Sequence, residues 1–111
     1  MSGHRVAPSP KTRFYTATKY AVTALVEGWR QELRDIGNGN NIRVGQLSPG
    51  VVETEFAQVM NANDKKIADA LYGSMDCLTA EDMAECLKFI LAAPPRMQIH
   101  DILVRPTQQK F

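Results

Sequence analysis

Tyr15 and Lys19 are the residues whose types and spacing suit a chemical role. They lie four positions apart in a stretch with helical periodicity, so both side chains share one helix face, with Cβ atoms about 5–6 Å apart. A phenol has an unperturbed pKa of about 10, and a nearby ammonium stabilises the phenolate and lowers that pKa. The pair therefore suits general acid–base work on a carbonyl or an alcohol. Tyr15 as a plain aromatic residue at a helix start is the alternative.

A second motif follows about thirty residues later, where a predicted strand ends in Leu47-Ser48-Pro49-Gly50-Val51-Val52-Glu53-Thr54. Alone, this segment is typical of an ordinary turn. Together with the Tyr-x-x-x-Lys helix it resembles the short-chain dehydrogenase/reductase family. In that family such a helix precedes a strand that ends in Pro-Gly, with a Thr shortly after. The resemblance extends over residues 3–107.

The resemblance assigns the two helix residues to both chemistry and coenzyme binding. Tyr15 would be the proton donor and acceptor at the substrate oxygen. Lys19 would hold the nicotinamide ribose hydroxyls and lower the pKa of Tyr15. The coenzyme would be NADP or NAD. The tail at 101–107 resembles one branch of the family, which implies NADP and an apolar substrate such as a ketosteroid or an isoprenoid alcohol.

Four residues after the helix complete the implied coenzyme contacts. Pro49 and Gly50 would shape the turn under the nicotinamide. The backbone of Val52 would meet the carboxamide, and Thr54 would reach the carboxamide or the pyrophosphate. The family's Gly-x-x-x-Gly-x-Gly turn, which cradles the pyrophosphate on a helix N-terminus, does not occur in this sequence.

The missing Gly-rich turn leaves the activity of the chain open. We expect residues 1–111 to be the C-terminal part of a single NAD(P)-binding Rossmann-fold domain, and hence a partial oxidoreductase. We expect the catalytic serine of the family just before Met1, with Ser2 as its neighbour. Ser2 as the catalytic serine itself is the alternative. The alternatives are a truncated, non-catalytic product that only pairs with a full-length relative, and an incomplete gene model with no function of its own.

Periodicity and caps predict the elements that must position these residues. A helix is predicted over 15–34, with one stripe of larger residues and one of small residues, namely Val22, Leu25, Trp29 and Leu33, and Ala17, Ala21, Ala24 and Gly28. A strand over 42–47 should stop at Ser48-Pro49-Gly50. A helix over 79–92 should begin with Thr79 as N-cap and Asp82 as its capping-box partner, and a last strand should cover 98–104.

The order strand, helix, strand predicts an α/β fold with a parallel pair. The family resemblance implies that this pair is the last portion of a doubly wound Rossmann-type sheet. Parallel sheets normally have several strands and both faces covered, so this portion would be incomplete by itself. The segment 51–60 has no clear pattern, and 62–72 is weakly helical. Residues 56–72 match the position of the family's substrate-covering loop. Their apolar side chains either line a substrate pocket or only anchor a short helix.

Composition excludes several classes of function. The net charge is +1, with Lys and Arg scattered, so nothing favours nucleic acid or an anionic membrane as partner. No apolar run approaches the roughly 20 residues that cross a bilayer. Cys77 and Cys86 fit no metal spacing and indicate reduced thiols in a cytoplasmic protein. We expect His4 and His100 to be solvated, and the helix over 15–34 to support a homo-oligomer or pairing with a full-length relative.

Overall fold

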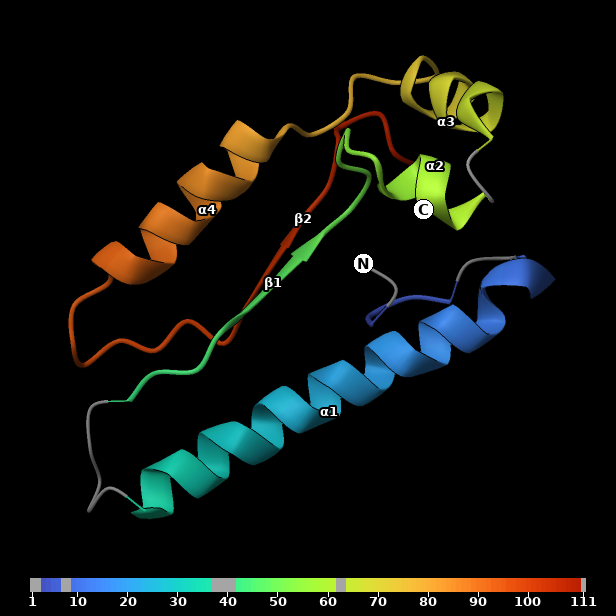
Figure 1. Ribbon diagram of the computed structural model, residues 1–111. Coiled ribbons are helices and arrows are strands. Elements are labelled where there is room, and N and C mark those ends of the chain that lie inside the picture. The colour runs from blue at the N-terminus through green and yellow to red at the C-terminus, as the bar shows by residue number, and fades with distance from the viewer. Residues whose placement is uncertain (1–2, 7–8, 37–41, 62–63, 111) are drawn as a thin grey trace.

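The computed structural model of the chain describes residues 3–6, 9–36, 42–61 and 64–110. The elements in this part are η1 (Pro10–Thr12), α1 (Arg13–Ile36), β1 (Gln46–Pro49), α2 (Phe56–Met60), α3 (Lys65–Tyr72), α4 (Ala80–Ala92) and β2 (Asp101–Val104). β1 and β2 pair in parallel, and Gln46 lies opposite Asp101. Helix α1 lies on one side of the two strands and α4 on the other (Figure 1). The predicted α/β fold with a parallel pair is confirmed.

Both long helices form where local signals predicted them. Helix α1 covers the predicted span and begins two residues earlier, after the 3-10 turn η1, which has Pro10 in its first turn. Helix α4 begins after Thr79, whose side chain accepts a hydrogen bond from the Asp82 amide. The Asp82 carboxylate in turn accepts from the Thr79 amide at 2.8 Å. This capping box is confirmed, and it satisfies amides that have no partner inside the helix.

The predicted strand over 42–47 is corrected, because β1 runs from Gln46 to Pro49. It begins four residues later than predicted and includes Ser48 and Pro49, two of the three residues expected to stop it. The ladder explains why proline is tolerated. The amides of Gln46 and Gly50 donate to carbonyls at 100 and 104, at 2.9 and 2.7 Å. Amides that point toward β2 therefore alternate along β1, and the nitrogen of Pro49 falls on the other edge, where β2 needs no donor. The last strand is also shorter than predicted, covering 101–104.

The described part of the chain buries little apolar surface. Ala57 and Ala68 are its buried apolar residues. Its radius of gyration is 16.3 Å, whereas a compact chain of this length has about 13 Å. The chain therefore has a sparse core in this conformation. Among the helices described, none combines the length and apolar character that a membrane span requires.

The larger apolar stripe of α1 points away from the strands. Val22, Leu25 and Trp29 are 45%, 55% and 53% exposed. The side of α1 nearer the sheet instead carries Thr16, which is buried, and Thr23, which is half-buried. The structure thus excludes a core role for Trp29 within this chain and leaves an uncovered apolar face on α1.

Candidate active site

Tyr15 and Lys19 occupy the first turns of α1, on one face as predicted. The Lys19 ammonium nitrogen lies 5.5 Å from the centroid of the Tyr15 ring. No carboxylate in the described ranges forms an ion pair with Lys19. The lysine charge is therefore available to the phenol and to a bound group.

Phe56 brings α2 to this pair. Its ring centroid lies 6.0 Å from that of Tyr15, and the two ring planes meet at 43°. This tilted arrangement is a normal aromatic contact. The segment expected to cover the substrate site therefore does reach Tyr15, and Phe56 itself remains 53% exposed.

The Pro49-Gly50 turn lies at the end of β1 and is covered by the C-terminal tail. The Gln109 side-chain oxygen accepts a hydrogen bond from the Val51 amide at 3.0 Å. A Cβ atom added at Gly50 would collide with that same oxygen and would lie 3.0 Å from Cγ of Arg105. A side chain at Gly50 would therefore require the Gln109 side chain to move.

Val52 forms a parallel bridge with Leu78, after the turn. The Glu53 amide donates to the Leu78 carbonyl at 2.8 Å, and the Leu78 amide donates to the Val51 carbonyl at 3.1 Å. In such a bridge the peptide groups of Val52 itself point to the opposite side. They therefore point away from Leu78.

Thr54 follows on the same segment. Its hydroxyl oxygen accepts a hydrogen bond from the Phe56 amide at 3.3 Å. Its carbonyl accepts from the Tyr72 hydroxyl at 2.6 Å. A hydroxyl that accepts one bond keeps its own proton for a second partner, so Thr54 retains a donor.

The structure thus brings Tyr15, Lys19 and Phe56 together through direct ring and charge contacts. The predicted coenzyme residues at 49–54 lie on one segment that starts with the last residue of β1. Phe56 continues that segment and links it to the tyrosine. Ser2 lies outside the described residues.

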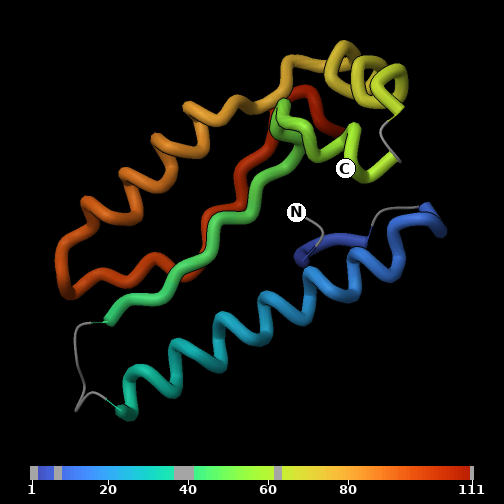
Figure 2. The backbone as a smooth tube through the Cα atoms, in the orientation of Figure 1, coloured from blue at the N-terminus to red at the C-terminus, as the bar shows by residue number. Residues whose placement is uncertain are grey.

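His4 is corrected, because it is part of a polar cluster rather than a solvated loop residue. Its Nε2 lies 2.7 Å from an Asp101 carboxylate oxygen and 3.0 Å from the Ser48 hydroxyl. The Gln46 amide nitrogen donates to the same carboxylate oxygen at 3.1 Å. Figure 2 shows the N-terminal segment between the strands and the first half of α1. A Cβ atom on Gly3 would lie 2.8 Å from the Lys19 carbonyl oxygen, so the segment packs tightly on the helix.

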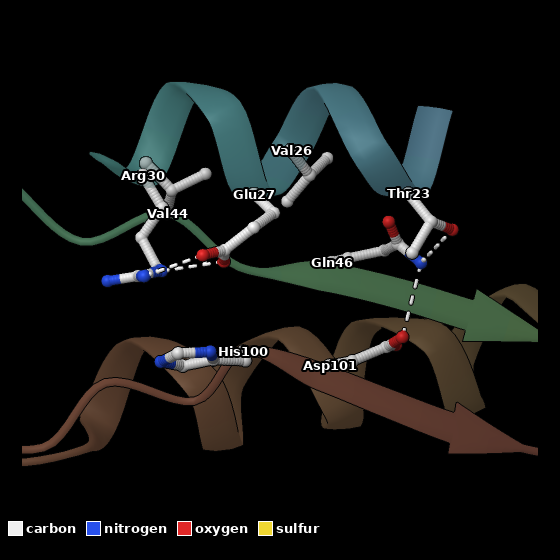
Figure 3. A pocket seen from close by; sticks show the side chains of 8 residues that line it. All are labelled: Thr23, Val26, Glu27, Arg30, Val44, Gln46, His100 and Asp101. Atoms are coloured by element: carbon white, nitrogen blue, oxygen red, sulfur yellow. Dashed lines mark hydrogen bonds and ion pairs between the residues drawn. The ribbon is translucent and has the colours of Figure 1, made fainter. Parts of the chain in front are cut away.

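A cavity of about 110 Å³ adjoins this cluster (Figure 3). It lies between α1 and the strands and is lined by Thr23, Val26, Glu27, Arg30, Val44, Gln46, His100 and Asp101. Neither Tyr15 nor Lys19 lines this cavity. Thr23 lies one turn beyond Lys19 on α1, and its hydroxyl donates to the Lys19 carbonyl at 3.3 Å.

Three groups have shifted pKa values. Hydrogen bonds from Arg30, and then from Gln31, lower the pKa of Glu27 from 4.5 to about 2, and the same pairing raises the pKa of Arg30. Burial raises the pKa of the Cys77 thiol, with repulsion from Glu53 and Asp76 adding to the effect. None of the three groups bonds to Tyr15 or Lys19, so these shifts concern local stability and thiol reactivity.

Known proteins match most of this chain in sequence. The family model "short chain dehydrogenase" matches residues 1–65. The chain is 53% identical over 109 residues to dehydrogenase/reductase SDR family member 11 of Bos taurus, covering 98% of this chain and 42% of that protein. It is 37% identical over 109 residues to farnesol dehydrogenase of Aedes aegypti, covering 98% and 40%.

A solved structure also matches this chain over its whole length. The closed form of serine dehydrogenase complexed with NADP+ is similar with a TM-score of 0.82 at 28% sequence identity. The similarity covers 100% of this chain and 43% of that chain. The chain thus spans about two fifths of the length of the proteins it matches.

Proposed function

Because the chain belongs to the short-chain dehydrogenase family, we propose that it forms the proton-transfer and nicotinamide-facing part of an NAD(P)-dependent oxidoreductase. The observation that carries this proposal is the Lys19 ammonium, 5.5 Å from the Tyr15 ring centroid on one helix face. A phenol beside a fixed positive charge suits proton exchange with a substrate oxygen.

Tyr15 moves the proton in this proposal. In the direction of reduction, its hydroxyl donates a proton to the oxygen of a carbonyl substrate, which becomes an alcohol. In oxidation, the phenolate takes the proton back from the alcohol. Lys19 stabilises the negative charge that appears on the phenol oxygen when the proton leaves, because an ammonium close to a developing anion lowers its energy.

The residues after β1 fit a nicotinamide coenzyme. The peptide groups of Val52 point away from Leu78, and a carboxamide needs one acceptor and one donor of this kind. Thr54 keeps a hydroxyl proton to donate, and Lys19 offers its ammonium to the ribose hydroxyls. The tight turn at Pro49 and Gly50 would keep the backbone close to the nicotinamide. The coenzyme, when bound, supplies or accepts the hydride. We favour NADP, which the similar serine dehydrogenase binds.

The substrate in this proposal is a small apolar carbonyl or alcohol. Phe56 contacts Tyr15, and the exposed side chains of Val59 and Met60 extend the apolar surface of α2. Such surfaces favour apolar ligands over charged ones. The name of the mosquito relative, farnesol dehydrogenase, supports an isoprenoid alcohol, and a ketosteroid fits the same surface.

Pairing through α1 is the second part of the proposal. Leu25 and Trp29 form an uncovered apolar stripe, flanked by the small residues at 17, 21, 24 and 28, which permit close helix approach. The stripe supports a homo-oligomer, or pairing with a full-length relative. The latter is also the alternative function, in which the chain is a non-catalytic partner.

A chimera tests the proposed function. It joins the part of the Bos taurus relative that precedes the aligned segment to residues 1–111 of this chain. We expect the chimera to oxidise NADPH with an apolar diketone. Lys19→Met should both weaken coenzyme binding, measured by fluorescence titration, and lower the rate. A folded chimera that binds NADPH without turnover would refute the catalytic proposal and favour the non-catalytic alternative.

A further inference from the structure

The hydroxyl of Tyr72, at the end of α3, hydrogen-bonds the backbone on both sides of Phe56. It donates to the Thr54 carbonyl at 2.6 Å and accepts from the Ala57 amide at 3.2 Å. The Tyr72 hydroxyl oxygen therefore links the backbone at Thr54 and at Ala57, on either side of Phe56, to helix α3. Thr54 and Tyr72 are 18 positions apart in the chain.

The packing of α2 on α3 brings this hydroxyl into reach. Ala57 and Ala68 are 3% and 4% exposed. Small side chains at these positions let the two short helices approach closely. Tyr72 follows one turn after Ala68, which places its ring on the side of α3 that faces α2.

A further hydrogen bond holds the backbone between Thr54 and Phe56. The Thr54 hydroxyl oxygen accepts a hydrogen bond from the Phe56 amide at 3.3 Å. The path of the backbone from 54 to 57 is thereby set by one internal contact and by the two contacts of Tyr72. Phe56 extends from this segment, and its ring centroid lies 6.0 Å from that of Tyr15.

We propose that Tyr72 is a positioning residue whose hydroxyl fixes the segment from Thr54 to Ala57 and so holds Phe56 against the Tyr15 ring. Phe56 is then a placed apolar wall beside the proton carrier rather than an anchor for a short helix. The role of this wall in holding substrate rests on the proposed oxidoreductase function. The placement of the ring does not.

The first test uses the 111-residue chain and nuclear magnetic resonance of its three tyrosines. Tyr72→Phe keeps the ring and removes only the hydroxyl. Phe56→Leu gives the Tyr15 ring signal without its aromatic neighbour. We expect Tyr72→Phe to move the Tyr15 signal at least half of the way to the Phe56→Leu position. Tyr20→Phe, the same deletion at an exposed site on α1, should leave the Tyr15 signal in place.

Amide hydrogen exchange in the same samples separates positioning from general destabilisation. Tyr72→Phe should accelerate exchange at the Ala57 amide, which loses its acceptor, and leave the amides inside α3 unchanged. An unmoved Tyr15 signal would overturn the proposal. So would equal acceleration throughout α3, because Tyr72 would then support the helix and not the placement of Phe56.

The second test asks whether the wall serves substrate binding, and it uses the chimera. In the chimera, Tyr72→Phe removes the hydroxyl that holds the segment from Thr54 to Ala57. It should raise the KM for an apolar ketone about fivefold, with kcat and the KM for NADPH unchanged. An unchanged ketone KM beside a moved Tyr15 signal would overturn the substrate role alone. A chimera without turnover beside a moved Tyr15 signal would count against the oxidoreductase function and leave the role of Tyr72 in placing Phe56 intact.

Discussion

Leu25→Ala should weaken self-association of the chain through α1. Leu25 is 55% exposed and lies about one turn from Trp29, which is 53% exposed, on the same uncovered face. A symmetric dimer places the same stripe of both copies in contact, so each substitution acts twice. Removing part of the Leu25 side chain therefore takes apolar contact from both halves of the interface.

The size of the change in the dimer Kd follows from the exposed fraction of the Leu25 side chain. Leu→Ala removes three carbons, each worth about 0.8 kcal/mol when fully buried. Because about half of the Leu25 side chain remains to be covered by a partner, each copy loses about 1.3 kcal/mol on the same scale. Two copies lose about 2.6 kcal/mol, which raises the dimer Kd about 80-fold.

Trp29 provides the assay, because it is the only tryptophan in the sequence. Its emission should shift to shorter wavelength as the concentration rises and the stripe is covered, and sedimentation velocity should give the same Kd. Phe89→Ala is the matched control, since Phe89 is 60% exposed on α4, on the other side of the strands. A Kd within about threefold of the unsubstituted chain, or an equal effect of Phe89→Ala, would refute pairing through this face.

Three further outcomes are expected. Arg43→Ala should destabilise the end of α4 by about 1 kcal/mol, because the Arg43 guanidinium donates to the Ala93 carbonyl at 2.7 Å; thermal unfolding by circular dichroism measures this, and Arg43→Lys should lose less. The pKa of Glu27 is lowered from 4.5 to about 2, so its stabilising effect on α1 is complete above about pH 4.5 and is lost as pH falls toward about 2. When helicity is followed by circular dichroism during an acid titration, Glu27→Gln should remove this part of the loss. The 111-residue chain should show no heat of NADP binding in isothermal titration, because its sequence has no Gly-rich turn for the pyrophosphate; clean micromolar binding would contradict this.

The parts of the fold that depend on neighbouring residues were predictable. Helix α4 follows from its apolar spacing and from the Thr79–Asp82 capping box, which acts within four residues. The shared face of Tyr15 and Lys19 follows from helix geometry alone. Local periodicity also placed Leu25 and Trp29 on one face, but it could not say what lies across from that face.

The parts that depend on distant segments were missed. The end of β1 was predicted wrongly because tolerance of Pro49 depends on which edge of the strand meets β2. His4 bonds to Asp101, 97 positions away, and Tyr72 bonds to Thr54 across a helix pair. Neither contact has a short-range pattern. A histidine near a glycine, or a tyrosine at a helix end, is otherwise typical of the surface.

Turnover of the Tyr15→Phe chimera tests the central claim most directly. Phenylalanine keeps the ring that contacts Phe56 but has no proton to exchange. Steady-state oxidation of NADPH with an apolar diketone should fall by about 100- to 10,000-fold, the usual contribution of a general acid, while NADPH binding persists. Tyr20→Phe, on the same helix, should retain full activity. A Tyr15→Phe chimera that keeps more than about a tenth of the rate, far above what loss of a general acid allows, would contradict the assignment of Tyr15 as the proton carrier.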